Sequence, residues 1–166
     1  MSLIVETGTG IASAEVYSTL AEFRAYRPHG GLALPAGLSD ALTEAALVRG
    51  TAFVEGAYAH RWPGVRETEA QSLAWPRVDA WDDDDYELTL VPAGVKNACM
   101  EAALIEANTV GALSLALERG GMVIHEKVGN LETGYANNAP ASTVYPIIKQ
   151  CLAGIIRGGG GVKLSR

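Results

Sequence analysis

Residues 39–60, "SDALTEAALVRGTAFVEGAYAH", contain the longest helical pattern in this 166-residue chain. Ser39 suits the N-cap position, because its side-chain oxygen can accept a hydrogen bond from a free backbone N–H of the first turn. The apolar residues that follow recur at spacings of three and four, as on one buried face of a helix: Leu42, Ala45, Ala46, Ala52, Phe53, Gly56 and Ala57. The sequence therefore predicts a helix over about residues 40–60, ended by Trp62-Pro63-Gly64.

Two further helices are expected on either side of this one. Thr19 and Glu22 have the spacing of a capping box, so a short helix should begin at Thr19 and end near Arg27, before Pro28. Pro92 suits the first turn of a third helix, which could continue, bent or interrupted at Gly111. Its expected buried face consists of Val95, Ala98, Cys99, Ala102, Ala103 and Ile105.

The pattern changes after Gly120. Gly129-Asn130 lies between "MVIHEKV" and "LETGYA", which is typical of a two-residue β-hairpin turn. A last helix is expected to begin at Ser142 or Thr143, with Pro146 in its first turn. The predicted fold is therefore mainly α, a small helical bundle with one short β-hairpin and flexible N- and C-terminal segments. Residues 1–156 form a single domain in this interpretation, and residues 157–166 form a glycine-rich tail.

Length, composition and charge bound the classes of function. The chain is long enough for one domain with a core, and its hydrophobic fraction of 48% with 19% charged residues describes a globular protein. The net charge of −6 and the pI near 5.0 argue against a protein whose main task is to bind phosphate backbones, although a local basic patch is not excluded. We expect no signal peptide and no membrane span, and synthesis in the cytoplasm. Cys99 and Cys151 are expected to be reduced and buried.

No motif of catalysis or cofactor binding is found along the chain. Gly8 and Gly10 lack the third glycine of a dinucleotide-binding fingerprint and the Gly-Lys-Ser/Thr of a phosphate loop, so a flexible turn is expected there. The histidines His29, His60 and His125 have no metal-ligand spacing. We therefore expect a protein that is not an enzyme and has no cofactor and no metal site.

The stretch "LAWPRVDAWDDDDYE", residues 73–87, raises the question of a site. The acidic run consists of Asp82, Asp83, Asp84 and Asp85, which are adjacent rather than alternating and have no following glycine, unlike a calcium loop. A solvated loop is expected, with a weak divalent-cation site as the alternative. In an assembly the run could instead face a ring lumen or a subunit boundary.

The three tryptophans lie in loops around the predicted helices. Large rings in loops either anchor the loop to the core or fill the pocket of a partner. We expect Trp75 to be a structural anchor that packs on the long helix, with Pro76 fixing the direction of the chain. Trp62 and Trp81 are candidates for a partner interface, as is the acidic run. The tail adds the cations Arg157, Lys163 and Arg166 as further interface candidates, because they follow or flank four consecutive glycines and no acid lies among them.

Several stretches together resemble the head–tail connector (adaptor or head-completion) proteins of tailed phages. The similar stretches are "LIVETGTGIASAEVYSTLAEFRAY", "LSDALTEAALVRGTAFVE", "QSLAWPR", "VPAGVKNACMEAAL", "EKVGNLETGYA" and "STVYPIIKQCLAG". They cover most of the chain, and "LAWPR" is the most specific of them. The same family also carries the label of a DnaT-like single-stranded-DNA-binding protein.

The resemblance implies a structural virion protein at the head–tail interface of a phage, made in the host cytoplasm. Residues 1–156 would be a helical, adaptor-like domain assembled as a homo-oligomeric ring, commonly a dodecamer. Its implied partners are the portal protein and a tail, stopper or neck protein, and genomic DNA would pass through the lumen without specific binding. No membrane is involved. The alternative function is that of the second label, single-stranded-DNA binding, which should produce oligonucleotide binding with a steep dependence on salt.

Overall fold

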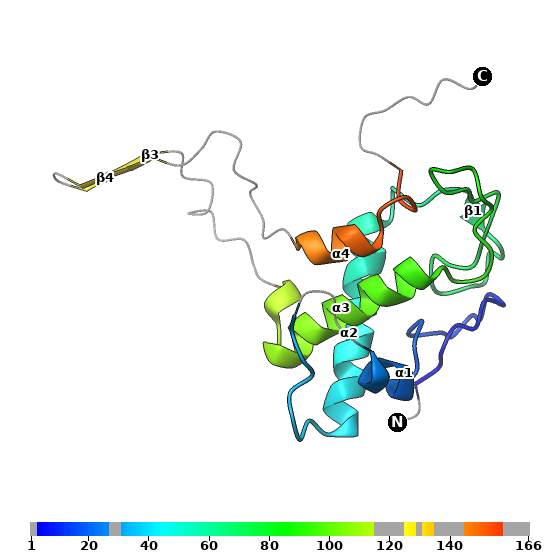
Figure 1. Ribbon diagram of the computed structural model, residues 1–166, viewed down its shortest axis with the longest axis horizontal. Coiled ribbons are helices and arrows are strands. Elements are labelled where there is room, and N and C mark those ends of the chain that lie inside the picture. Colours follow the sequence, from blue (N-terminus) through cyan, green and yellow to red (C-terminus); the bar gives the residue numbers. More distant parts are fainter. Residues whose placement is uncertain (1–2, 27–30, 115–124, 129–130, 135–144, 158–166) are drawn as a thin grey trace.

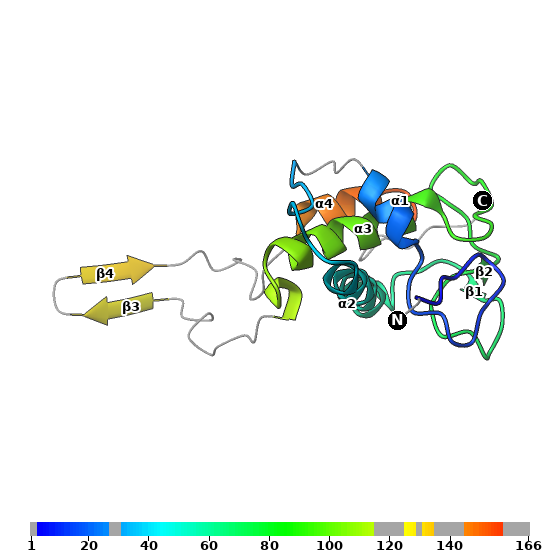
Figure 2. The ribbon, with the colours of Figure 1, turned by 90° about the horizontal axis from the view of Figure 1, so that it is seen from below.

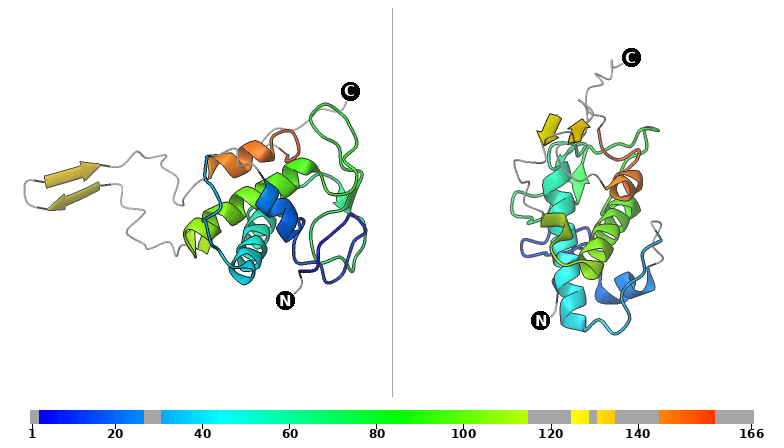
Figure 3. Two further views of the ribbon diagram at one scale, coloured as in Figure 1. Left: turned by 60° about the horizontal axis from the view of Figure 1, so that its bottom comes forward. Right: turned by 90° about the vertical axis from the view of Figure 1, so that its left-hand side faces the viewer.

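Helices α2 (Asp40–Tyr58) and α3 (Ala93–Asn108) pack against each other at the centre of the computed structural model (Figure 1). The structure describes residues 3–26, 31–114, 125–128, 131–134 and 145–157. Two short helices, α1 (Leu20–Ala25) and α4 (Pro146–Cys151), complete the helical body, and α3 lies between α2 and α4 (Figure 3). A 3-10 turn, η1 (Ala112–Ser114), follows α3. The prediction of a mainly helical fold is confirmed.

Two small antiparallel sheets accompany the helices. Strand β1 (Val65–Arg66) pairs with β2 (Arg77–Val78), with Val65 opposite Val78 and Arg66 opposite Arg77. Strand β3 (His125–Val128) pairs with β4 (Leu131–Gly134), which confirms the predicted hairpin, while its turn at residues 129–130 lies outside the described residues. Figure 2 shows β3 and β4 on one side of the helices and β1 and β2 on the opposite side.

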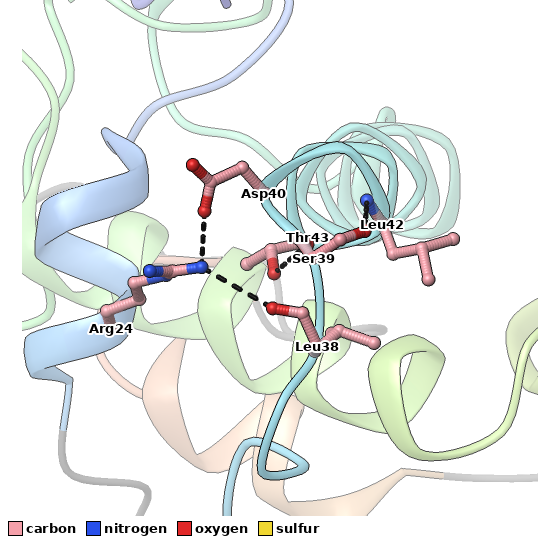
Figure 4. A network of polar contacts seen from close by, with 6 residues as sticks. All are labelled: Arg24, Leu38, Ser39, Asp40, Leu42 and Thr43. Carbon is pink, nitrogen blue, oxygen red and sulfur yellow. Dashed lines mark hydrogen bonds and ion pairs between the residues drawn. The ribbon is translucent and has the colours of Figure 1, made fainter.

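The beginnings of the first two helices follow the predicted caps. Thr19 Oγ1 accepts from the backbone N–H of Glu22 at 3.1 Å, and Glu22 Oε2 accepts from the N–H of Thr19 at 2.6 Å, so the capping box is complete. Ser39 accepts from the N–H of Leu42 at 3.4 Å. Figure 4 shows how the last turn of α1 is joined to the first turn of α2, because the guanidinium of Arg24 pairs with Asp40.

The predicted buried face of α2 is wrong in most positions. The residues that the helix buries are Thr43, Ala46, Leu47, Gly50, Thr51 and Val54, while Leu42 is 53% exposed. The physical reason is a close approach of two backbones: a methyl group at Gly50 would lie only 2.5 Å from the backbone nitrogen of Ala103 in α3. Small and weakly polar residues permit this contact, whereas the prediction counted apolar residues only.

The buried face of α3 agrees better with the prediction. Val95, Ala98, Cys99, Ala102 and Ala103 are buried, as expected, and Ile105 is half-buried. Helix α4 covers part of this face with Ile148, and Leu152 just beyond it is also fully buried. Its described part begins at Pro146, and the expected start at residues 142–143 lies outside the described residues. The expected continuation of α3 beyond Ser114 lies outside them too.

The loop between β1 and β2 is fixed to α2 through buried polar groups. Tyr17 donates its hydroxyl hydrogen to Glu55 Oε1 at 2.6 Å and accepts from the backbone N–H of Trp75 at 3.0 Å. The second oxygen of Glu55 accepts from the N–H of Ala74 at 2.7 Å. Trp75 is fully buried and meets Trp62 edge to face, with ring centroids 6.1 Å apart. These contacts hold the loop with the ring of Trp75 inside the core, against Trp62.

The N-terminal segment is organised around the buried carboxylate of Glu6. Its two oxygens accept hydrogen bonds of 2.7–3.1 Å from four backbone N–H groups, those of Gly8, Thr9, Gly10 and Ile11. Two of these residues, Gly8 and Gly10, have positive φ angles of 100° and 72°, a region in which other residues are strained. The turn that the glycines form therefore encloses a carboxylate of the protein itself.

Candidate functional site

Four arginines from separate segments gather at one end of the helical body, and we call this surface the arginine end. Arg61 follows α2, Arg66 lies in β1, Arg77 lies in β2, and Arg157 follows α4. Figure 1 shows the end of α4 on the same side of the body as the loops around β1. Since Arg66 and Arg77 are paired across the two strands, the short sheet brings two cations together directly.

Two hydrogen bonds join the other two arginines, one between backbone groups and one from a side chain. The N–H of Arg157 donates to the carbonyl oxygen of Arg61 at 2.8 Å, and Nε of Arg61 donates to the carbonyl oxygen of Arg157 at 3.1 Å. The guanidinium of Arg61 also lies over the ring of Tyr58, 5.7 Å from its centroid. The chain after α4 is thereby fixed beside the end of α2.

Arg77 is the most enclosed of the four. Its guanidinium donates to the carbonyl oxygens of Pro63, Gly64 and Ala74, so its position is determined by the loop around it. Burial lowers the pKa of Arg77, the carboxylate of Glu55 raises it, and the nearby charges of Arg157 and Arg66 lower it further. The influence of Arg157 and Arg66 on this pKa shows that the three arginines lie close together, with the carboxylate of Glu55 also near Arg77.

A groove of about 420 Å³ lies beside the arginines. Its lining combines apolar surface from Trp62 and Leu73 with polar groups of Glu55, Arg66, Ser72 and Arg77. Burial raises the pKa of Glu55, and the hydrogen bonds from Tyr17 and Ala74 lower it by less, so the net shift is upward. Arginines next to a partly apolar groove can contact phosphate with their guanidinium groups and flat apolar groups with the groove.

The charge of the arginine end is not neutralised by ion pairs within the described part of the chain. None of the four arginines has a carboxylate oxygen of a described residue within 4.0 Å. By contrast, Arg24 pairs with Asp40, Arg49 with Glu106, and Lys96 with Glu22. The chain as a whole carries −6, so four arginines without an ion pair among the described residues are a distinct feature of it.

The acidic run forms a tight, exposed turn near the same end. Asp82 Oδ1 accepts from the N–H groups of Asp84 and Tyr86 at 2.9 and 2.8 Å, while Asp83, Asp84 and Asp85 are exposed. The N–H of Asp83 donates to the carbonyl oxygen of Gly154 at 3.0 Å, which fixes the turn beside the segment that leads to Arg157. Across the described residues, no group of three or more potential ligands is arranged for a metal ion.

The remaining predicted site residues are separated by the fold. Trp81 is 52% exposed on the loop after β2, whereas Trp62 is 4% exposed and lies in the core of the single chain. Trp75 and Pro76 are both buried. Arg157 belongs to the arginine end, while Lys163 and Arg166 lie outside the described residues.

The arginine end itself was not predicted from the sequence. Its members are spread over residues 61–157, and only the pairing of β1 with β2 and the contact between Arg61 and Arg157 bring them together. Arg157 was already an interface candidate because it precedes the glycine-rich stretch, whereas no local pattern indicates Arg61, Arg66 or Arg77. The sequence did not exclude a local basic patch, but it did not indicate which residues would form one.

Within the described residues, no helix has both the length and the hydropathy that a membrane span requires. No curated protein and no solved structure shows a significant match to the chain. A family model matches all of it, and this model bears the second of the two labels that the sequence suggested; nothing in the comparisons supports the connector label. The chain belongs to the family described as "Putative DnaT-like ssDNA binding protein", whose model it matches over residues 1–166.

Proposed function

We propose that the protein binds single-stranded DNA with micromolar affinity through the arginine end. The observation that carries this proposal is the grouping of four arginines that have no carboxylate partner among the described residues, in a chain whose net charge is −6. The family description supports the same ligand. The proposed function requires no catalytic group and no cofactor.

The proposed contacts follow from the chemistry of the surface. Arg66 and Arg157 are exposed and Arg61 is half-buried, so their guanidinium groups can reach the phosphates of a flexible strand. The donors of Arg77 are engaged by three backbone carbonyls, and Arg77 therefore contributes charge and holds the loop in place. The groove beside them is lined in part by Trp62 and Leu73, but both are almost fully buried, so it offers a base only a small apolar surface.

The affinity should be low for a physical reason. About three phosphate contacts release few counterions, and the negative charge of the rest of the chain opposes the approach of a polyanion. We therefore expect a Kd of roughly 10⁻⁶ to 10⁻⁴ M at about 0.15 M salt, which is the range of non-specific binding.

A titration of a fluorescently labelled oligonucleotide, followed by anisotropy at low salt, tests the proposal. Replacing Arg66 and Arg157 by glutamine should weaken binding at least about tenfold, because two of the three phosphate contacts are lost. The matched control replaces Arg24 and Lys96 by glutamine, which changes the net charge equally but removes cations that pair with Asp40 and Glu22. Equal losses in the two variants would contradict a localised interface.

A second candidate function is that of a head–tail connector that assembles as a ring on a portal protein. The observation that favours it is the β3–β4 hairpin, whose strands pair with each other and which lies apart from the helices in Figure 2. An isolated two-stranded hairpin has only marginal stability in water, and packing against a partner would stabilise it.

The two candidates predict different results. A connector should form rings when mixed with the portal protein, visible by negative-stain electron microscopy, and should not bind oligonucleotides even at low salt. Salt-sensitive oligonucleotide binding without rings supports the first candidate. Rings without oligonucleotide binding support the second.

A further inference from the structure

We infer that Asp83 and Asp84 make the arginine end selective for single-stranded over duplex DNA, by repelling the second phosphate strand. This inference rests on the proposed function. It assigns a role to Asp83 and Asp84, whereas the side chain of Asp82 holds the turn, and no metal site is found among the described residues. Both side chains are exposed, so their carboxylates face solvent.

The first step is that the acidic turn lies close to the arginines. Asp83 is hydrogen-bonded to Gly154, and Gly154 precedes Arg157 by three residues, a span of at most about 11 Å of chain. On the other side, Asp82 follows Arg77 by only five residues. The acidic turn is therefore tethered on both sides to segments that carry these cations, and we take about 12 Å as the separation between its carboxylates and the phosphates of a bound strand.

The second step is that this distance allows repulsion of a ligand. At about 0.15 M salt the Debye length is about 8 Å, so each carboxylate–phosphate pair at about 12 Å is strongly screened. At about 0.02 M salt the screening length is about 20 Å, and most of the repulsion remains. For two carboxylates and two or three phosphates, Coulomb repulsion in water lowers the affinity for a single strand about twofold at the higher salt and about fivefold at the lower.

The third step concerns the difference between the two forms of DNA. A duplex carries about one charge per 1.7 Å of its axis, twice the density of either of its strands. A duplex held at the arginine end would bring roughly twice as many phosphates within range of the aspartates. The repulsion free energy then doubles, so the factor by which it lowers the affinity is squared and becomes about 25 at about 0.02 M salt. The fivefold difference between the two penalties is the contribution of the two aspartates to the selectivity.

The test compares the affinities for an oligonucleotide and for its duplex, measured by anisotropy at about 0.02 M salt. The variant Asp83→Asn with Asp84→Asn should bind the single strand about fivefold more tightly and the duplex about 25-fold more tightly than the parent protein. The side chain of Asp82 is left in place, because it holds the turn through the N–H groups of Asp84 and Tyr86.

The control variant, Asp40→Asn with Glu44→Gln, changes the net charge by the same amount at the opposite end of α2. That helix has 19 residues and is therefore about 28 Å long, beyond the screening length. The control should leave the ratio of the two affinities unchanged. If both variants raise the two affinities by the same factor, the selectivity inference is wrong while the proposed function stands. If neither the parent protein nor either variant binds single-stranded or duplex DNA, both the proposed function and the inference are wrong.

Discussion

Replacing Glu6 by glutamine should destabilise the protein by about 3 kcal/mol at neutral pH. The carboxylate accepts four backbone N–H groups, and hydrogen bonds to a charged group contribute about 1.5–3 kcal/mol each when their partner is removed. Glutamine keeps one acceptor oxygen but loses the charge and turns an amide N–H₂ toward a donor. The N–H of Ile11, now at 2.7 Å from Glu6 Oε2, would lose its acceptor.

The effect should reach the whole domain, because the turn is tied to the core. The N–H of Ser72 donates to the carbonyl oxygen of Ile11 at 3.3 Å, and the hydroxyl of Ser72 donates to that of Ala14 at 2.6 Å. Loss of the turn therefore loosens the loop that contains Trp75. For a chain of this size, about 3 kcal/mol corresponds to a fall in melting temperature of about 6–12 °C.

The effect should also depend on pH in one direction. Burial raises the pKa of Glu6, but the four hydrogen bonds outweigh it and hold the pKa below its ordinary value of 4.5. A carboxyl group with a lowered folded-state pKa contributes stability that is complete above the unfolded-state pKa and is lost as the pH falls through the folded-state value. The difference between parent and variant should therefore be full at pH 7 and shrink below about pH 4.5.

Thermal unfolding followed by circular dichroism, at neutral and acidic pH, measures both parts of this prediction. The control is Glu15→Gln, because Glu15 is exposed and, within the described part of the chain, its carboxylate accepts from the N–H of Ile4 alone, at 3.2 Å. It should cost less than about 1 kcal/mol. A Glu6→Gln variant that melts like the parent, or a difference that does not change with pH, would refute the reasoning.

Three further predictions concern the core and the acidic turn. Trp75→Ala should cost about 3–5 kcal/mol, since the ring is fully buried, and near-parental melting would show that the ring is not an anchor. Gly50→Ala should lower the melting temperature, because its methyl group would meet the backbone of Ala103 in α3. Gly56→Ala in the same helix is the control, because its methyl group would meet open space and should stabilise the protein by about 0.5–1 kcal/mol. Shifts of the same sign in the two variants would contradict the packing of α2 on α3. Adding EDTA should change the melting temperature by less than about 1 °C relative to the untreated protein, and a fall of several degrees would indicate a structural metal ion.

The helix ends were predictable because their signals are local. Thr19, Glu22 and Ser39 satisfy N–H groups within three residues of themselves, so the sequence alone contains both partners of each bond. The hairpin strands follow from the same kind of short-range pattern. The buried face of α2 was not predictable from the spacing of apolar residues. Gly50 is buried because the backbone of α3 lies close to it, and not because glycine is hydrophobic.

The candidate site depends on contacts that are distant in sequence. Arg61 and Arg157 are 96 residues apart and are joined by one backbone hydrogen bond and one from the Arg61 side chain, and nothing near either residue in the sequence indicates the other. The acidic run was evident in the sequence, but its position beside Gly154 was not. Sequence reasoning therefore found the charges but could not show that opposite charges share one end of the molecule.

The central claim is that the arginine end binds single-stranded DNA through about three phosphate contacts. The most direct test is the dependence of the association constant on salt, measured with a labelled oligonucleotide between about 0.02 and 0.2 M. Each contact with a single strand contributes about −0.7 to the slope of log K against log salt, so the predicted slope is about −2. Absence of binding at the lowest salt, or binding with a slope near zero, would contradict the claim.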